Sequence, residues 1–189
     1  MDASRAADNR RPVVTVFGSS TPHPGDDEYR VALALGRELA RQGFTICNGG
    51  YGGTMEASAR GAQEAGGAAI GVTVPLFSRN PNRYLDRIIE RTTLFERITT
   101  LIETGDAYVV LRGSTGTLLE FAAVWELLNK KLMEEKPLML LGPFWTGVLD
   151  LLRDEALPGR PGKITSLVRV VSSPEECAGY LRKRLILNG

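Results

Sequence analysis

The chain has 189 residues, of which 43% are hydrophobic, and 23 basic against 22 acidic side chains give a formal net charge of +1. A chain of this length can bury one sizeable core, so we expect a single domain. Because the charges are so nearly balanced, no long-range field draws the protein toward nucleic acid or an anionic membrane, and we expect neither as a partner. Any anion must therefore bind through a local site.

Cysteine and histidine usage indicates a reduced protein without a metal. Cys47 and Cys177 are too few and too far apart in sequence for a disulfide framework, and one histidine, His23, cannot form a zinc site based on two histidines. Residues 1–11 are polar and lack the apolar core of a signal peptide, and no run of about 18 apolar residues occurs. We therefore expect a cytoplasmic protein with no cofactor, a flexible tail over residues 1–11 and one domain over residues 12–189.

Apolar strands alternate with amphipathic helices along the chain. Short β-branched or apolar runs predict strands, and runs with helical periodicity that end near glycine predict helices. The predicted strands are Pro12–Phe17, Phe44–Cys47, Ala68–Val72, Ala107–Leu111, Leu138–Leu141 and Leu167–Val171. The predicted helices are Tyr29–Gln42, Thr54–Ala65, Leu94–Thr104, Thr117–Lys131, Thr146–Leu152 and Pro174–Leu185. Almost wholly apolar strands separated by helices predict an α/β, Rossmann-like three-layer sandwich with a mostly parallel, doubly wound sheet.

The loops after three of these strands are the most glycine- and serine-rich turns of the chain. They follow Phe17, Cys47 and Leu111. In open parallel sheets, ligands bind beyond the carboxyl ends of the strands. We therefore expect these three loops to converge and to form the functional site.

Residues 48–54, Asn-Gly-Gly-Tyr-Gly-Gly-Thr, lie between a predicted strand and a predicted helix. Glycines let backbone amides approach an anion, and the helix dipole favours that anion further. The spacing matches neither the dinucleotide-binding fingerprint nor a nucleotide-triphosphate loop. A tight turn accounts for one or two of the glycines but not for four in five positions, so we favour contact with a phosphate or ribose. The predicted contacts are Gly49, Gly50, Gly52, Gly53 and Thr54.

A second glycine-rich turn opens the helix after the fourth predicted strand. Gly113 and Gly116 stand among three hydroxyl side chains, Ser114, Thr115 and Thr117. The first four amides of a helix lack partners within it. A simple N-cap by Ser114 or Thr115 would need one hydroxyl, not three. We therefore favour phosphate binding by all five residues.

One carboxylate lies on a strongly apolar helix. Glu120 has Ala123, Val124 and Leu127 on its own face, so we expect partial burial, which raises a carboxyl pKa unless an arginine opposes it. Such a carboxylate can act as a general base or stabilise developing positive charge, and the alternative is a structural salt bridge. Arg97 lies early in the preceding helix. Its spacing fits two interpretations equally well, a clamp on a phosphate or substrate and a surface residue.

Two further patterns each allow two interpretations. Arginines recur at four-residue spacing before the Arg97 helix, at Arg79, Arg83, Arg87 and Arg91. They fit a phosphate-gripping lid, but we favour a solvated helix face with local ion pairs. The helix that carries Phe121, Val124, Trp125 and Leu128 is apolar nearly all round, which fits either deep burial or a subunit interface.

These residues resemble the signature of the Lonely Guy (LOG) family, whose members are cytokinin riboside 5'-monophosphate phosphoribohydrolases formerly called lysine decarboxylase-like. The family motif is Pro-Gly-Gly-x-Gly-Thr-x-x-Glu, and residues 112–120 read Arg-Gly-Ser-Thr-Gly-Thr-Leu-Leu-Glu. The spacing from Arg97 to Glu120 also agrees with the family. Residues 18–20 resemble its first loop and residues 49–55 its second glycine segment.

The resemblance extends from about Val13 to Leu141, with three departures from the family pattern. Arg112 stands where proline is usual, and Ser114 replaces the second glycine of the motif. Ile98 replaces the lysine that normally follows the arginine. Arg97 and Glu120 are both present, so the departures bear on phosphate geometry and base preference.

The resemblance implies a Rossmann-like homodimer or larger oligomer that hydrolyses the N-glycosidic bond of a nucleoside 5'-monophosphate. The substrate would be of the AMP or cytokinin riboside monophosphate type, and the products free base and ribose 5-phosphate. Arg97 and Glu120 carry over as the catalytic pair, and Gly18, Ser19 and Met55 join the substrate-binding residues. Glu120 would stabilise an oxocarbenium-like state or activate water, while Arg97 holds the substrate and orients the carboxylate.

Two other functions compete with hydrolysis. A non-catalytic nucleotide- or cofactor-binding carrier can use the same fold, because a fold does not fix chemistry. A pyridoxal-dependent decarboxylase, suggested by the older family name, needs a lysine close to the phosphate site. The first lysine of the chain is Lys130, outside the three glycine-rich loops, so we discount this function.

Overall fold

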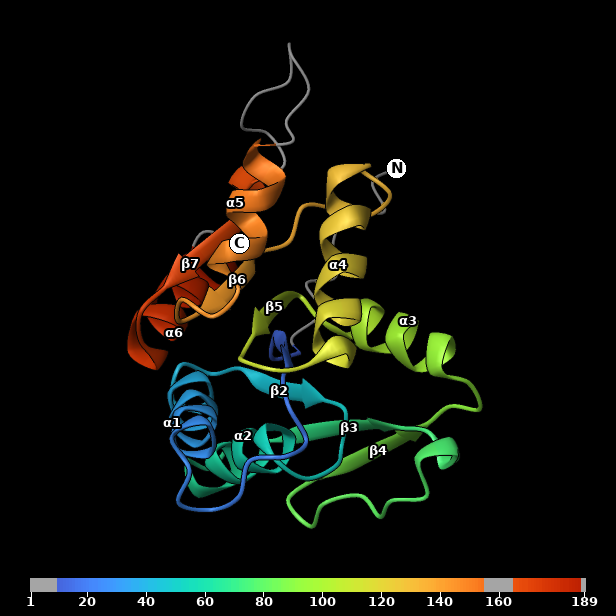
Figure 1. Ribbon diagram of the computed structural model, residues 1–189. Helices are drawn as coiled ribbons and strands as arrows, with labels where there is room; N and C mark the ends of the chain where they lie inside the picture. The colour runs from blue at the N-terminus through green and yellow to red at the C-terminus, as the bar shows by residue number, and fades with distance from the viewer. Residues whose placement is uncertain (1–9, 155–164, 188–189) are drawn as a thin grey trace, which may run out of the picture.

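A computed structural model describes residues 10–154 and 165–187. Within them, seven strands form one sheet in the order β4-β3-β2-β1-β5-β6-β7, and each strand pair of this described sheet is parallel (Figure 1). The strands are β1 Val13–Phe17, β2 Thr45–Asn48, β3 Ala69–Thr73, β4 Arg87–Glu90, β5 Ala107–Val110, β6 Leu138–Leu141 and β7 Val168–Val171. The parallel sheet predicted from the apolar strands is confirmed.

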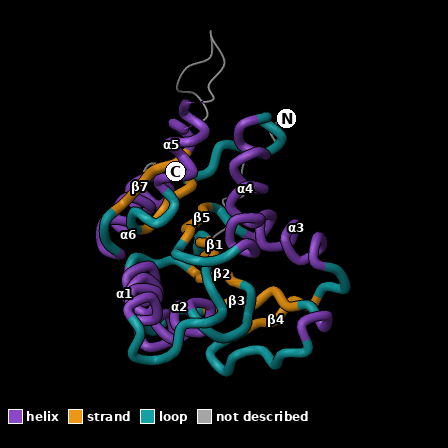
Figure 2. Tube along the Cα trace, viewed as in Figure 1, coloured by secondary structure: helices purple, strands orange, loops and turns teal. Residues whose placement is uncertain are grey.

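The sheet lies between two layers of helices. The helices are α1 Asp27–Arg41, α2 Thr54–Glu64, α3 Leu94–Thr104, α4 Thr115–Asn129, α5 Thr146–Asp154 and α6 Pro174–Arg182. Helices α1, α2 and α6 pack on one face and α3, α4 and α5 on the other, which confirms the doubly wound, Rossmann-like sandwich (Figures 1 and 2). No helix among the described residues is long and apolar enough to cross a bilayer.

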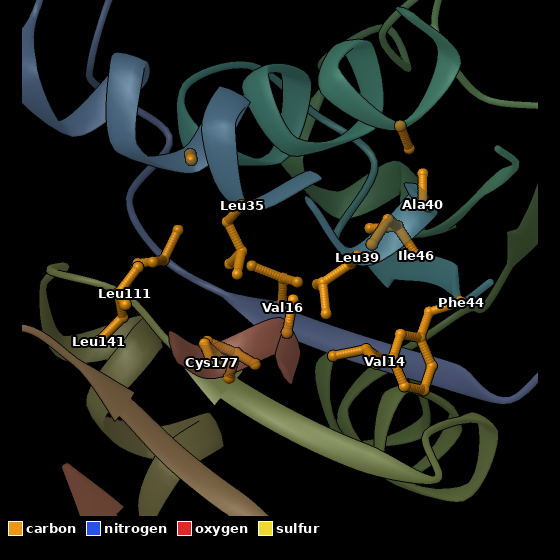
Figure 3. Close-up of a cluster of buried hydrophobic side chains, with 14 of the residues drawn as sticks. Val14, Val16, Leu35, Leu39, Ala40, Phe44, Ile46, Leu111, Leu141 and Cys177 are labelled. Carbon is orange, nitrogen blue, oxygen red and sulfur yellow. The ribbon is translucent and has the colours of Figure 1, made fainter. Parts of the chain in front are cut away.

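Strand β1 illustrates why the central strands are almost wholly apolar. All five of its residues are buried. Val14 and Val16 belong to the hydrophobic cluster beneath α1, α2 and α6, whereas Val13 and Phe17 belong to the cluster on the opposite face. Figure 3 shows Val14 and Val16 on the side of the sheet where Leu39 of α1 lies. Since full burial of such a side chain stabilises the fold by about 1.5–3 kcal/mol, both faces of the strand contribute.

Helices α1 and α2 approach each other closely because each presents a glycine to the other. A Cβ at Gly36 of α1 would overlap the carbonyl oxygen of Ser58, and a Cβ at Gly61 of α2 would overlap the carbonyl oxygen of Leu33. Protein interiors are close-packed, so neither position has room for a larger residue. The two glycines thus set the distance between α1 and α2. These helices follow the loops after β1 and β2, which are two of the three loops expected to form the site.

The helical interpretation of residues 79–91 is wrong. Arg87–Glu90 forms β4, the edge strand, which pairs with β3 from Ile70 opposite Arg87 to Thr73 opposite Glu90. Residues 79–86 form the loop that precedes it. The β-branched pair at 88 and 89 favours a strand, and charged residues at both ends suit an exposed edge. The four-residue spacing of the arginines therefore does not reflect a helix.

The other predicted elements are confirmed, with ends that differ by a few residues, as is usual for helix termini. Helix α4 begins at Thr115 rather than Thr117, and α1 begins at Asp27 rather than Tyr29. A capping box starts α3, because the Thr93 hydroxyl accepts the Glu96 amide at 3.2 Å while the Glu96 carboxylate accepts the Thr93 amide. This cap fixes the turn of helix from which Arg97 projects.

Residues 1–9 of the predicted tail lie outside the described residues. Arg10, the first residue described, donates two hydrogen bonds of 3.0 Å to the carboxylate of Asp106, just before β5. The same carboxylate accepts the backbone amide of Val13 at 2.8 Å. This contact fixes the start of β1 next to the start of β5.

Substituting Gly36→Ala should lower the free energy of unfolding by about 1–3 kcal/mol, because the added methyl group forces α1 away from the Ser58 carbonyl. Gly179→Ala in α6 is the matched control, since among the described residues no heavy atom lies within 4 Å of a Cβ built there. It should stabilise the protein by up to about 1 kcal/mol through helix propensity. Urea denaturation measures both, and equal effects would contradict the close helix contact.

Candidate functional site

The candidate site lies at the carboxyl edge of the sheet where the direction of winding reverses. From β1 the chain moves outward through β2, β3 and β4, and it then returns to β5 on the other side of β1 and continues outward through β6 and β7. Loops after β1 and β5 therefore diverge and leave a crevice, the usual ligand position in such sheets. A cavity of about 350 Å³ occupies this place, which is within the range of small-molecule sites.

The three loops expected to converge do form this cavity, together with α3, α4 and the segment after β3. Nine of the predicted site residues line it, namely Gly18, Ser19, Gly49, Met55, Arg97, Ser114, Gly116, Thr117 and Glu120. The described wall residues do not include the other six, which are Gly50, Gly52, Gly53, Thr54, Gly113 and Thr115. Contact between those six and a ligand stays a prediction.

Arg97 and Glu120 meet inside the cavity. Arg97 Nη1 lies 3.2 Å from Glu120 Oε1, and the two side chains are only 6% and 12% exposed. Arg97 Nε also donates to the carbonyl oxygen of Val72 at 2.8 Å. Its guanidinium carbon lies 5.8 Å from the ring centres of both Tyr51 and Phe77. The surface position considered for Arg97 is therefore excluded, and the arginine is held from several sides.

Gly49 is the residue that makes room for this arginine. A Cβ at Gly49 would overlap Arg97 Nη2 and would lie 2.6 Å from the sulfur of Met55. The backbone before it is held by Asn48, whose side chain donates to the carbonyl oxygen of Met55 at 2.8 Å and accepts the amide of Gly50 at 2.8 Å. The glycine at position 49 thus has a specific steric reason, which is the buried guanidinium.

Burial controls the electrostatics of Glu120. Desolvation raises the pKa of Glu120 to about 7, against the opposing effect of the Arg97 charge and hydrogen bond. A carboxyl group with this pKa exchanges its proton near neutral pH, which suits acid–base chemistry. The salt bridge considered as the structural alternative is present, but the carboxylate also lines the cavity. The salt-bridge interpretation is therefore confirmed, and a catalytic role for Glu120 stays a prediction.

The glycine count in the 48–54 segment overstated the case for a phosphate cradle. Gly50 and Gly53 have φ angles of +80° and +68°, which favour glycine whatever binds nearby. A Cβ at Gly53 would also overlap the carbonyl oxygen of Ser19. The amide and the hydroxyl of Thr54 donate to this same oxygen at 2.9 and 3.0 Å. Turn geometry and packing thus account for Gly49, Gly50 and Gly53 without a ligand, and contact of the segment with a phosphate or ribose stays a prediction.

The start of α4 is the better candidate for an anion site. Ser114 is the N-cap residue, yet within the part of the chain that the structure describes its side chain makes no capping hydrogen bond. Ser114, Gly116 and Thr117 all line the cavity. A helix N-terminus presents unpaired amides and a favourable dipole to an anion. The sequence alternative of an ordinary serine cap is therefore excluded for this residue.

Several wall residues were not identified from the sequence. Phe77 and Tyr51 flank Arg97, and Leu94 and Leu119 add apolar surface. Arg79 belongs to the arginine series, and it also lines the cavity, where its Nη1 donates to Ser20 Oγ at 3.0 Å. A sequence signal for Arg79 was present, because a phosphate-gripping lid was one interpretation of the arginine series. Of the four arginines in that series, Arg79 is the one among the described wall residues of this cavity.

Fold and site together define a Rossmann-like α/β protein with a buried arginine–carboxylate pair beside a helix start, in the crevice where the sheet reverses its winding. The family model described as SLOG cluster4 matches residues 11–154, and the chain belongs to this family. The resemblance to the LOG family expected from the motifs is confirmed by its relatives.

Two relatives with a stated activity cover most of the chain, and a third relative without one covers about half of it. A cytokinin riboside 5'-monophosphate phosphoribohydrolase of Rhodococcoides fascians is 29% identical over 170 residues, which cover 84% of each protein. A protein of the same name from Mycobacterium tuberculosis is 30% identical over 145 residues, 74% of each protein. An uncharacterized protein of Archaeoglobus fulgidus is 33% identical over 97 residues, 51% of this chain and 64% of that protein.

Solved structures share the fold over nearly the whole chain. The molybdenum cofactor binding protein of Rippkaea orientalis superposes with a TM-score of 0.75 at 24% identity, covering 94% of this chain and 99% of that one. The molybdenum cofactor carrier protein of Chlamydomonas reinhardtii gives a TM-score of 0.73 at 23% identity, covering 93% and 99%. At these identities the likeness is one of fold.

Substituting Gly49→Ala should displace the Arg97 guanidinium and so raise the pKa of Glu120 above about 7, because the opposing cation moves away. Gly52→Ala is the matched control, since the nearest atom to a Cβ there, the carbonyl oxygen of Ser20, lies 3.8 Å away. A carbon-detected NMR titration of the Glu120 carboxyl in both variants tests this. An unchanged titration in Gly49→Ala would show that Gly49 does not position the arginine.

Proposed function

We propose that this protein hydrolyses the N-glycosidic bond of a nucleoside 5'-monophosphate and releases the free base and ribose 5-phosphate. The observation that carries the proposal is the nearly buried Arg97–Glu120 pair, with 3.2 Å between Nη1 and Oε1. The pair lies on the wall of a cavity that the start of α4 also lines. The names of the relatives from Rhodococcoides fascians and Mycobacterium tuberculosis support the same reaction.

The cavity provides what this reaction needs at both ends of the substrate. Breaking the bond between base and ribose builds positive charge on the sugar. The ionised Glu120 either stabilises this charge directly or activates the water molecule that attacks the sugar. Arg97 holds the carboxylate in one orientation through the 3.2 Å contact. The amides and hydroxyls at Ser114, Gly116 and Thr117 bind the 5'-phosphate, so binding energy far from the scissile bond assists the reaction.

The departures from the family motif leave this chemistry in place. Ile98 is 5% exposed and lines the cavity, so it adds apolar surface where the family has a lysine. Ser114 offers a hydroxyl at the helix start. Arg112 points elsewhere, because its Nη1 pairs with Glu28 Oε1 at 3.0 Å. The cavity wall at position 98 is therefore more apolar than the family pattern, and AMP-type nucleotides remain the proposed substrate class.

The second candidate function is a non-catalytic nucleotide or cofactor carrier. It is favoured by the hydrogen bond between Arg97 and Glu120, because a carboxylate already paired with an arginine can be a purely structural group. The two functions differ in a single outcome. A carrier binds AMP and returns it intact, whereas the hydrolase releases adenine.

Substituting Glu120→Gln should reduce adenine release from AMP by about 10²- to 10⁴-fold, the usual contribution of a general base, while AMP binding is retained. Glu126→Gln is the matched control, because Glu126 lies on the same helix in an exposed pair with Lys130, 3.8 Å apart. Chromatography follows adenine, and calorimetry follows binding. Wild-type turnover in Glu120→Gln would remove the carboxylate from the mechanism.

The rate should also depend on pH. Because burial raises the pKa of Glu120 to about 7, its reactive ionised form is scarce at low pH and predominates only above this value. We expect kcat/KM for AMP to rise about tenfold per pH unit below pH 7 and to level off above it. A profile that is flat or falls from pH 5 to pH 8 would contradict the role of Glu120 as a base.

We also propose that two copies associate through the exposed face of α3 and α4. Phe95 on α3 is 71% exposed, and Leu118 and Leu119 on α4 are 37% and 38% exposed. Leu119 also lines the cavity, so a second copy there would shield the site from water. The sequence allowed either deep burial or a subunit interface for four apolar residues of α4. All four are buried against the sheet, namely Phe121, Val124, Trp125 and Leu128.

Substituting Leu118→Glu should therefore convert a dimer to a monomer in sedimentation velocity, because a charge cannot be buried without a partner. Val31→Glu is the control, since Val31 is 40% exposed but lies on α1, on the opposite face of the sheet. A wild-type protein that sediments as a monomer at micromolar concentration would refute the association.

A further inference from the structure

The loop after β3 contributes two side chains to the wall of the cavity. This loop, which we call the Arg79 loop, covers residues 74–82 and begins with one short helical turn, Pro75–Phe77. Phe77 and Arg79 both line the cavity. Phe77 lies against Arg97, with 5.8 Å from its ring centre to the guanidinium carbon. Arg79 is thus a cation on the wall to which the proposed reaction gives no part.

Hydrogen bonds attach both ends of the Arg79 loop to the glycine segment after β2. The Tyr51 hydroxyl accepts the amide of Val74 at 2.8 Å and donates to the carbonyl oxygen of the same residue at 2.7 Å. The amide of Asn82 donates to the carbonyl oxygen of Gly50 at 2.8 Å. The Asn82 side chain donates to the carbonyl oxygen of Tyr51 at 2.9 Å. The position of the loop beside the cavity is therefore fixed at both ends.

The middle of the Arg79 loop is turned so that two of its side chains reach the cavity. Phe77 packs edge-on against Tyr51, with 5.8 Å between ring centres. Ser78 follows with a φ angle of +48°, in the left-handed region, so the chain turns sharply at this residue. Arg79 comes directly after the turn and lines the same cavity as Phe77. The packed ring thus holds the loop, and the turn sets the course of the arginine.

Arg79 reaches across to the first loop. Its Nη1 donates to Ser20 Oγ at 3.0 Å. The amide of the neighbouring Ser19 donates to the carbonyl oxygen of Arg112 at 3.3 Å, two residues before Ser114, the N-cap residue of α4. Arg79, Ser19, Ser20 and Ser114 all line the cavity. Two hydrogen bonds through the first loop therefore link Arg79 to the helix start that is proposed to bind the phosphate.

The charges on the cavity wall do not balance. Among the described wall residues, the charged side chains are Arg79, Arg97 and Glu120. Arg97 pairs with Glu120, whose carboxylate is 3.2 Å away. In the described chain, Arg79 bonds to the neutral hydroxyl of Ser20 and belongs to no ion pair. Two arginines against one ionised carboxylate leave one positive charge, which favours an anionic ligand.

We propose that Arg79 is a phosphate-binding residue, which contacts the 5'-phosphate of the bound nucleotide together with the start of α4. On binding, its guanidinium exchanges the Ser20 hydroxyl for phosphate oxygens, and the planar fork can bind two of them at once. The loop is fixed at both ends, so this exchange needs movement of the side chain alone. The inference rests on the proposed function for its ligand, a nucleoside 5'-monophosphate, and adds a residue that recognises it.

Calorimetric titration of the full chain with AMP and with adenosine tests this contact. The wild-type protein should bind AMP more tightly than adenosine. Arg79→Gln should weaken AMP binding by about 10- to 100-fold, the loss expected for a charge-assisted hydrogen bond, and leave adenosine binding unchanged. The weakening should shrink as salt is added, because salt screens exposed charges. Arg79→Lys keeps the charge but not the fork, so it should lose less affinity than Arg79→Gln.

Arg83→Gln is the matched control, because Arg83 follows the same loop but is not among the described wall residues. Its guanidinium lies over the ring of Tyr84 instead, 5.0 Å from the ring centre. This variant should bind AMP as the wild-type protein does. Unchanged AMP affinity in Arg79→Gln would overturn the proposal. An equal loss of AMP and adenosine affinity would also overturn it, because Arg79 would then only shape the cavity.

Assaying adenine release in the same samples distinguishes a failure of this contact from a failure of the proposed function. If AMP affinity depends on Arg79 but adenine never appears, the contact stands and hydrolysis is wrong. If adenine is released and Arg79→Gln binds AMP as tightly as the wild-type protein, hydrolysis stands and the contact is wrong. A wild-type protein that does not bind AMP would refute both.

Discussion

A single buried ion pair organises the site of this protein. Arg97 carries a full charge at a position that is 5% exposed, and an isolated buried charge is very costly. The fold meets this cost with the Glu120 carboxylate, the Val72 carbonyl and the rings of Tyr51 and Phe77. In return, Arg97 keeps the carboxylate beside the cavity, where burial raises its pKa to about 7. Arg97 thus fixes the position of Glu120, while burial raises the pKa of this carboxyl against the opposing effect of the arginine.

The winding of the sheet explains where this pair lies. The cavity opens over β1, β2 and β5, so it lies at the reversal of winding between β1 and β5. The start of α4 follows β5 and lines the cavity through Ser114, Gly116 and Thr117.

The sequence predicted the sheet and the pair because each has a local signal. Strands buried on both faces must be apolar, and the motif from Arg112 to Glu120 is specific. The edge strand β4 was missed, since Arg87 at its start belongs to a series of arginines whose four-residue spacing mimics a helix. The contacts of Phe77 with Arg97 depend on loops that meet only in three dimensions. The glycines at 49, 50 and 53 were found, but their steric reasons lie in neighbours far along the chain.

The central claim is that the ion pair acts on the sugar of a bound nucleotide and is more than a structural contact. Single-turnover incubation of excess wild-type protein with AMP, followed by quantification of all products, tests this most directly. We expect adenine and ribose 5-phosphate in equal amounts, with loss of AMP to match. Recovery of bound AMP in full, with neither product formed, would contradict it.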